Sequence, residues 1–250
     1  MIPYVRRKMI LSEIKKKELV YFEELLKKVE NISESTLRRD LKVLEKEGYV
    51  DLLRGSAVKI RTSSYDMPLQ AKERLHAKEK ERIAKHAAYL VEDGEVIYLD
   101  SGTTILHMVK YLKDKHIKVI TSNIQIVNIL QGCSFYCILL GGEISISLGS
   151  VSGPITDKLL SELFFDKSFL GASGYTVEGG INTPDLREAN KKRLAMEHSQ
   201  QTFVLVDGSK AGKQTLCKAF DIDDCIIITD EPNEILEKHA KFIVVPELIT

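Results

Sequence analysis

The chain has 250 residues, of which 44% are hydrophobic and 29% charged, a balance typical of a globular protein and unlike that of collagen or a disordered chain. This length favours a small domain joined to a medium-sized one. No apolar run approaches the ~20 residues of a membrane span, and the N-terminus lacks a signal peptide's continuous apolar stretch, so we expect a cytoplasmic protein with no membrane partner. The four cysteines and six scattered histidines form no disulfide framework or metal-site spacing, and we predict neither a metal nor a cofactor.

The formal net charge of zero hides a difference between the two ends of the chain. Residues 1–62 contain 15 basic and 10 acidic residues, whereas the rest of the chain contains 21 basic and 26 acidic ones. A basic N-terminal part favours an anionic partner for that part.

Residues 1–62 are predicted to form three short helices and a hairpin. Apolar residues recur at helical spacing within 10–14 and 22–29, and a third helix follows Ser33, its expected N-cap. Residues 49–62 alternate apolar and polar side chains around Arg54-Gly55-Ser56, which predicts a hairpin. Together these elements make a winged helix-turn-helix domain, and the Ser-, Asp- and Pro-containing segment 63–71 is the expected linker.

The third helix has an apolar face and a basic face. Leu37, Leu41 and Leu44 share one side, and the opposite side carries Arg39 and Lys42. A helix that enters the DNA major groove needs this arrangement, although a solvated surface helix can also show it. The candidate DNA contacts are Ser33, Ser35, Thr36, Arg38, Arg39, Lys42 and, in the hairpin, Arg54.

Residues 72–250 alternate between helical and strand patterns. Helices are expected over 71–94, 103–113, 124–131, 186–199 and 233–240, and Val/Ile/Leu-rich strands over 95–100, 117–122, 135–142, 167–174, 202–209, 225–230 and 241–246. Strands that are apolar throughout are buried on both faces. The chain is therefore predicted to be an α/β protein, with a winged helix-turn-helix domain followed by a larger C-terminal α/β domain that has a mostly parallel sheet.

A polar loop joins the first strand of this domain to a helix. The loop, Asp100-Ser101-Gly102-Thr103-Thr104, offers unpaired backbone N–H groups, a glycine that permits close approach and three hydroxyl donors, which suit a ligand phosphate. The alternative is that the hydroxyls only cap the helix.

Similar loops end other strands. They contain Thr121-Ser122-Asn123, Gly141-Gly142, the segment 171–174 and the segment 207–210. Because the carboxyl ends of parallel strands lie at one edge of a sheet, we expect a ligand site there.

The string Ser33-x-x-Thr36-Leu37-Arg38-Arg39-Asp40-Leu41 resembles the DNA-binding domain of the DeoR family of bacterial transcription regulators. The family usually has a His-Gly-Gly-Ala turn in the wing, where this chain has Arg54-Gly55-Ser56-Ala57. The resemblance implies a helix-turn-helix over about residues 21–40 that binds double-stranded operator DNA.

The C-terminal part is similar to the sensor domain of the same family, whose sheet resembles that of ribose-5-phosphate isomerase and whose members respond to phosphorylated sugars or related metabolites. The matching strings cover residues 79–84, 100–104, 139–143, 166–174, 188–193 and 207–210. The resemblance implies a ligand phosphate at Ser101, Thr103 and Thr104, a second cation at Lys210, and Glu188 and Lys192 near the sugar. The predicted effector-binding residues are Asp100, Ser101, Gly102, Thr103, Thr104, Thr121, Ser122, Asn123, Gly141, Gly142, Glu188, Lys192 and Lys210.

Two of these assignments have alternatives. Glu188 and Lys192 are i,i+4 neighbours on an ideal helix, so their spacing also fits a surface ion pair. The family commonly has Thr-Asn-Ser at the position of Thr121-Ser122-Asn123, which leaves the polar contact there open.

The favoured function is a repressor of sugar-metabolism genes that binds DNA as a homo-oligomer, a dimer or a tetramer, and responds to a phosphorylated sugar. One alternative is a sugar-phosphate isomerase, since Asp100, Asp207 and Glu188 could transfer protons. Another is a DNA-binding protein whose C-terminal domain is only an oligomerisation scaffold. A basic helix-turn-helix has no use in an isomerase, which favours the regulator over the enzyme.

Overall fold

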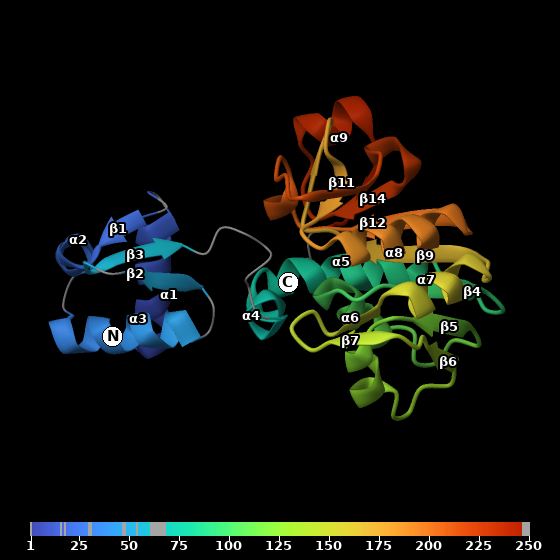
Figure 1. The fold of residues 1–250 in the computed structure, drawn as a ribbon, viewed down its shortest axis with the longest axis horizontal. Coiled ribbons are helices and arrows are strands. Elements are labelled where there is room, and N and C mark those ends of the chain that lie inside the picture. Colours follow the sequence, from blue (N-terminus) through green and yellow to red (C-terminus); the bar gives the residue numbers. More distant parts are fainter. Residues whose placement is uncertain are drawn as a thin grey trace. The chain divides into compact units, whose positions relative to one another are not determined.

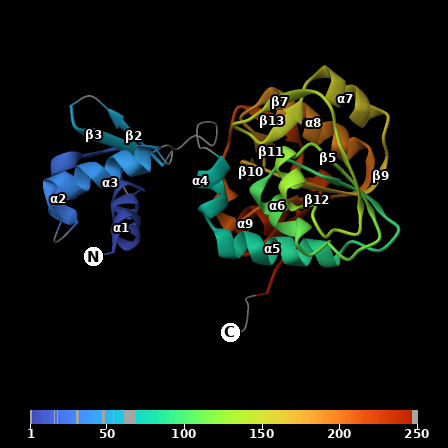
Figure 2. The ribbon, with the colours of Figure 1, turned by 90° about the horizontal axis from the view of Figure 1, so that it is seen from below.

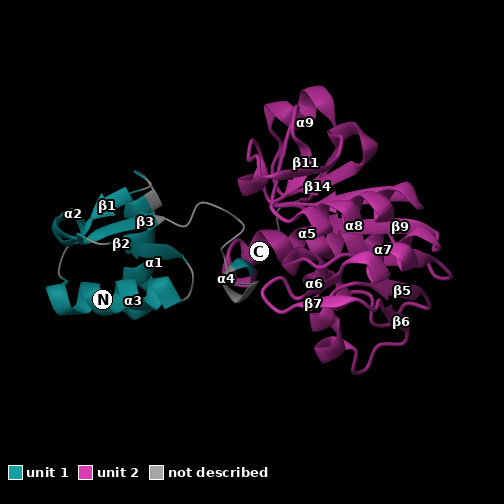
Figure 3. Cartoon of the chain, viewed as in Figure 1, with its two compact units in different colours: residues 1–72 teal, residues 73–250 magenta. Residues whose placement is uncertain are grey.

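The computed structural model describes residues 2–15, 17, 19–29, 32–46, 49–53, 55–60 and 69–246. The chain divides into two compact units, residues 1–72 and 73–250 (Figure 3). Arg54 of the predicted wing and residues 63–68 of the predicted linker lie outside the described residues, and residues 69–71 belong to the helix α4 (Leu69–Arg74).

The first unit combines helices with a small antiparallel sheet. Its elements are α1 (Pro3–Lys15), β1 (Leu19–Tyr21), α2 (Phe22–Lys28), α3 (Glu34–Lys46), β2 (Val50–Leu53) and β3 (Ala57–Ile60). The sheet order is β1-β3-β2, so the predicted hairpin β2–β3 is confirmed and a short strand that the sequence did not reveal is added to it. Gly55 and Ser56 turn the hairpin with φ angles of 82° and 61°, the left-handed conformation that tight hairpin turns require.

The helix α3 has the two faces that its sequence predicts. Leu37, Leu41 and Leu44 are buried in the core of the first unit, against residues of α1, α2 and the sheet. Ser33 caps the helix, because its Oγ accepts a hydrogen bond from the Thr36 backbone N–H at 3.3 Å. The opposite face of α3 is therefore left to the solvent.

The second unit is built on a seven-stranded parallel sheet, which confirms the predicted α/β class (Figure 1). The strands in spatial order are β15 (Lys241–Val244), β14 (Ile226–Thr229), β12 (Ser199–Leu205), β9 (Phe165–Gly171), β4 (Val96–Leu99), β5 (Lys118–Thr121) and β6 (Tyr136–Leu139). The helices are α5 (Ala77–Tyr89), α6 (Thr103–Val109), α7 (Pro154–Ser161), α8 (Leu186–Glu197) and α9 (Glu234–His239), with the 3₁₀ segments η1 (Ile124–Ile129), η2 (Gly208–Lys210) and η3 (Ile222–Asp224).

Helices cover both faces of this sheet. The side chains of Ile97 and Leu99 share one core with α5 and α6, while Tyr98, between them, belongs to the core on the side of α7, α8 and α9. Figure 2 shows α5 and α6 on one side of the sheet and α7 and α8 on the other. Burial on both faces explains why these strands are apolar throughout rather than alternating.

Some segments differ from the sequence prediction. The helix expected over 71–94 is broken into α4 and α5 by His76, whose φ of 52° is left-handed. The helix expected over 124–131 is the 3₁₀ segment η1. Two antiparallel sheets were missed: the hairpin β7 (Glu143–Ser145) with β8 (Ser150–Ser152), and the sheet of β10 (Gly174–Thr176), β11 (Gly180–Thr183) and β13 (Cys217–Phe220). Among the described residues, no helix is both long and apolar enough to cross a membrane.

Candidate functional site

The exposed face of α3 presents basic and hydroxyl side chains. Ser35, Arg38, Arg39 and Lys42 are exposed, and Thr36 is half-buried. Arg38 pairs with Glu34, with 2.7 Å between Nη2 and Oε1, and its guanidinium lies 4.7 Å from the centre of the Phe22 ring. No hydrogen bond or ion pair joins Arg39 to any described residue, so its guanidinium is available to a partner.

Asp40, next to Arg39 in the sequence, points into the protein instead. It is buried and forms an ion pair with Arg6 of α1, with 3.2 Å between Arg6 Nη2 and Asp40 Oδ1 for the longer of two hydrogen bonds. Asp40 therefore holds α3 against α1 through its ion pair with Arg6, whereas Arg39 is exposed to the solvent.

In the second unit, the carboxyl end of β4 is the switch point of the sheet. The chain runs from β4 to β5 and β6 on one side, and β9 pairs with the other side of β4. Asp100 follows β4 there, and its Oδ2 accepts a hydrogen bond from the Gly171 backbone N–H at the end of β9, at 3.1 Å. Ligands of open parallel sheets bind at such switch points.

Asp100 is fully buried and forms an ion pair with Lys192 of α8. Burial by itself raises the pKa of the Asp100 carboxyl, but the charges of Lys192 and Lys191 outweigh it and hold the pKa below its usual value. Burial lowers the pKa of Lys192, and the charges of Asp100 and Glu188 outweigh it and hold that pKa above its usual value. Both groups are therefore ionised at neutral pH.

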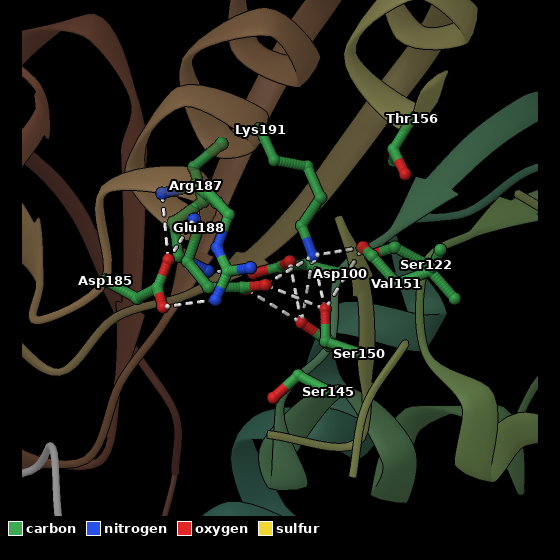
Figure 4. Close-up of polar contacts among 12 residues, drawn as sticks. Asp100, Ser122, Ser145, Ser150, Val151, Thr156, Asp185, Arg187, Glu188 and Lys191 are labelled. Atoms are coloured by element: carbon green, nitrogen blue, oxygen red, sulfur yellow. Dashed lines mark hydrogen bonds and ion pairs between the residues drawn. The ribbon is translucent and has the colours of Figure 1, made fainter. Parts of the chain in front are cut away.

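Glu188 and Lys191 of the same helix form a second buried pair (Figure 4). Lys191 Nζ lies 2.8 Å from Glu188 Oε1, 2.5 Å from Ser150 Oγ and 3.3 Å from Ser101 Oγ. The hydroxyls of Ser101 and Ser150 both donate to the Glu188 carboxylate, at 3.0 and 2.8 Å. The site therefore brings together the ends of β4, β8 and α8.

This arrangement decides between the two interpretations of Glu188 and Lys192. Both side chains are buried, 5% and 4% exposed, and each pairs with another residue rather than with the other. A surface ion pair is therefore excluded. Lys191 and Ser150 were missed by the sequence analysis, although Glu188, Lys191, Lys192 and Ala195 recur at the i, i+3, i+4, i+7 spacing of one helix face.

Ser101, Thr103 and Thr104 begin the segment that leads into α6. Gly102 is the N-cap residue of α6 and the helix begins without a side-chain cap, so the interpretation of these hydroxyls as simple caps finds no support. Thr103 and Thr104 are buried, and neither hydroxyl bonds to a described residue. Both remain available as donors.

The other predicted residues have structural partners at the same edge of the sheet. Thr121 Oγ1 donates to the Leu99 carbonyl at 2.6 Å, Ser122 Oγ lies 2.9 Å from the Tyr98 hydroxyl, and Asn123 Oδ1 caps η1. These contacts hold β5 and the loop after it against β4.

The glycines after β6 permit a close approach of α7. Gly142 has a φ of 146°, and a Cβ there would lie 2.2 Å from Thr156 Oγ1. Thr156 Oγ1 in turn donates to the Gly141 carbonyl at 2.8 Å. A side chain at Gly142 would therefore displace the N-terminal part of α7.

The turn at residues 207–210 ends β12. The Asp207 carboxylate accepts a hydrogen bond from the Ser209 N–H at 3.1 Å, and the Gly208 N–H donates to Asp230 at 2.8 Å. Burial raises the pKa of Asp207, but the charge of Lys210 and the hydrogen bond from Ser209 outweigh it and lower the pKa. Lys210 has no hydrogen bond or ion pair with the Glu188–Lys191 cluster in the described part of the chain.

One cavity lies away from the switch point. A surface cavity of about 410 Å³, lined by Phe164 and His198 among others, opens at the amino ends of β4, β9 and β12, the opposite edge of the sheet. No three His, Cys, Asp or Glu side chains of the described residues gather in a way that could hold a metal ion.

Comparison with known proteins matches one family model to most of each compact unit. Residues 6–63 match the DeoR-like helix-turn-helix domain and residues 75–231 the DeoR C terminal sensor domain. The chain is 36% identical to the HTH-type transcriptional regulator FruR of Bacillus subtilis (strain 168), over 92% of each chain. It is 33% identical to the lactose phosphotransferase system repressor of Staphylococcus epidermidis, over 84% of this chain and 85% of that one.

More distant similarity extends to an Escherichia coli protein and to an enzyme structure. The glycerol-3-phosphate regulon repressor of Escherichia coli (strain K12) is 29% identical over 89% of each chain. Among solved structures, ribose 5 phosphate isomerase A from Neisseria gonorrhoeae superimposes with a TM-score of 0.40 and 16% identity, over 56% of this chain and 54% of that one.

We predict that Asp100→Asn lowers the free energy of unfolding by about 3–5 kcal/mol at neutral pH, because it leaves the buried Lys192 without its counter-charge. The pKa of Asp100 is lowered in the folded state, so its contribution is present above the unfolded pKa of about 3.9 and is lost as the pH falls through the folded value. Denaturant titrations from pH 7 to pH 3 should therefore show the difference between parent and variant shrinking in acid. The exposed control Asp114→Asn should change stability by less than about 0.5 kcal/mol; a D100N variant as stable as this control would contradict the prediction.

Proposed function

Because the chain belongs to the DeoR family of transcriptional regulators, we propose that it is a repressor of sugar-metabolism genes whose operator binding is modulated by a phosphorylated sugar or a related metabolite. The helix-turn-helix unit binds DNA, and the relatives are named as transcriptional regulators and repressors, so the protein is a regulator and not an enzyme. The names of two relatives, which refer to a lactose phosphotransferase system and to glycerol-3-phosphate, support an effector of this chemical class.

One observation supports the effector site most directly. At the switch point, Ser101 bonds Glu188 of the buried ion pairs on α8, and the chain continues into Thr103 and Thr104, whose hydroxyls bond to no described residue. Hydroxyl and ammonium donors in a water-poor site are the groups that bind phosphate. We assign the phosphate to this loop, with Lys210 as a second cation, and the sugar hydroxyls to the polar edge formed by the other predicted residues.

The DNA contacts are proposed on α3 and the hairpin. Exposed Arg39 and Lys42 are suited to guanine edges and phosphates, and Ser33, Ser35, Thr36 and Arg38 lie at or near the N-terminal end of the same helix. Arg54 is assigned to the hairpin by the sequence alone. We place the DNA-binding domain at residues 1–62, the linker at 63–71 and the effector-sensing domain at 72–250.

We predict that Arg39→Ala weakens specific operator binding by about 1–3 kcal/mol, because an exposed arginine with no partner among the described residues is free to bond a base edge. Gel-shift titration at fixed salt measures the change. Lys238→Ala removes the same charge from an exposed position on α9 and should leave the affinity unchanged. Equal affinities of R39A and K238A would remove Arg39 from the DNA contacts.

We predict that Thr103→Glu keeps operator binding in the absence of the effector and no longer responds to the sugar phosphate that modulates the parent. A carboxylate would repel the phosphate, and each lost charge-assisted hydrogen bond costs about 1.5–3 kcal/mol, more than tenfold in affinity. An acidic residue in the first turn of α6 suits the helix dipole, so folding should survive.

Calorimetry with a panel of sugar phosphates and operator titrations with and without them test this variant. Thr103→Ser keeps the hydroxyl and is the matched control. Parent-like effector affinity in T103E would place the effector elsewhere. A parent that binds no member of the panel would instead favour the oligomerisation scaffold.

We also propose that the protein is a homo-oligomer, a dimer or a tetramer. Helix-turn-helix proteins commonly bind two DNA half-sites that are one or more helical turns apart. A symmetric oligomer supplies one helix-turn-helix unit for each half-site. Light scattering at micromolar concentration should give at least twice the mass of one chain; a monomer mass with and without operator DNA would refute it.

A further inference from the structure

Three hydrogen-bond donors converge on the carboxylate of Glu188. Ser101 Oγ donates to Oε2 at 3.0 Å. Ser150 Oγ and Lys191 Nζ both reach Oε1 at 2.8 Å (Figure 4). The donors come from three separate segments: the loop after β4, the strand β8 and the helix α8. An ammonium group and two hydroxyls from different segments therefore surround one anionic group.

Among these three donors, Lys191 is unusual because lysine side chains are rarely fully buried. Its side chain is fully buried, so its ammonium group has given up its hydration and needs an anion within the protein. Glu188 supplies that anion, and the Val151 carbonyl accepts a further hydrogen bond from Lys191 Nζ at 3.1 Å. A lysine that served only to solubilise α8 would point to the solvent.

We propose that Lys191, Ser101 and Ser150 form an anion-binding subsite, which the Glu188 carboxylate fills in the ligand-free protein and which the phosphate of the effector takes over by displacing Glu188. The donor set suits either anion, because carboxylate and phosphate oxygens accept the same hydrogen bonds. The inference rests on the effector site proposed above. It adds Lys191 and Ser150 to that site and makes Glu188 a competitor of the phosphate rather than a group that binds the sugar.

Displacement of Glu188 removes a contact between the helix α8 and the β7–β8 hairpin. Glu188 lies in the first turn of α8, and its neighbour Arg187 bonds Glu143 of β7 at 3.2 Å. Ser150, on the paired strand β8, bonds Glu188 directly. The β7–β8 hairpin is thus held to α8 by contacts on both sides of the subsite, and one of them is lost when an external anion replaces the carboxylate.

The test uses Glu188→Gln in the full chain with inorganic phosphate as the probe. Glutamine keeps the size of the side chain but carries no charge, so Lys191 loses its counter-charge. An external anion then no longer has to displace a carboxylate from the subsite. By calorimetry, against chloride at matched ionic strength, E188Q should bind phosphate at least about tenfold more tightly than the parent, the scale of one charge-assisted hydrogen bond. The exposed Glu162→Gln makes the same charge change at the end of α7 and should bind phosphate like the parent.

A second variant ties the gain to Lys191. In Glu188→Gln with Lys191→Met, the gain in phosphate affinity should disappear, because the cation of the subsite is gone. If E188Q is unfolded in chloride, phosphate should restore its folded circular dichroism spectrum. Unchanged or weaker phosphate binding by E188Q, a gain that survives K191M, or a failure of phosphate to restore folding would each overturn the subsite.

The outcomes separate this inference from the proposed function. If E188Q gains phosphate affinity while no sugar phosphate alters operator binding by the parent, the subsite stands and the proposed function fails. If a sugar phosphate modulates the parent while E188Q shows no gain, the proposed function stands and the subsite fails.

Discussion

The buried ion pair between Asp100 and Lys192 is the interaction on which the site depends. It fastens α8 to the end of β4, and Asp100 also accepts the Gly171 N–H at the end of β9. One carboxylate therefore joins two strands and a helix at the switch point of the sheet. Removing two charges from water costs several kcal/mol, which the pairing recovers only when every remaining donor and acceptor is satisfied. The pair thus specifies one position of α8 more than it stabilises the fold as a whole.

The helix α8 needs such specification because its inward face is polar. Glu188, Lys191 and Lys192 are buried on this helix, and among its apolar residues only Ala189 and Ala195 are fully buried. These small side chains provide little apolar area, and Leu194 and Met196 of α8 are only partly buried, so hydrogen bonds and ion pairs contribute much of what positions the helix. In this network the ammonium groups of Lys191 and Lys192 are already paired with the carboxylates of Glu188 and Asp100. A ligand anion can enter it at low cost only by replacing an anion that is already there.

The sequence revealed the sheet more completely than the site. Seven strands were predicted because strands buried on both faces are apolar throughout, and Leu37, Leu41 and Leu44 set the orientation of α3. The break at His76 was missed because neither glycine nor proline marks it. The hairpin β7–β8 was missed because its six residues follow no long alternating pattern. Lys191 and Ser150 were missed because their burial depends on partners that are distant in the sequence: Lys191 bonds Ser150 and Ser101.

The proposed exchange of Glu188 for a ligand phosphate sets what this sensor can distinguish. Because an entering anion replaces an internal carboxylate, its net gain is the difference between two similar sets of hydrogen bonds, and a monoanionic carboxylate gains little. A phosphate dianion adds a second negative charge beside Lys191 and has more acceptor oxygens than a carboxylate. The site therefore selects for charge and for the number of acceptor oxygens. By linkage, a ligand changes an equilibrium only by contacts that differ between the two states of the protein, so the proposed exchange modulates operator binding through a Glu188–Ser150 bond whose strength differs between the DNA-bound and the DNA-free protein.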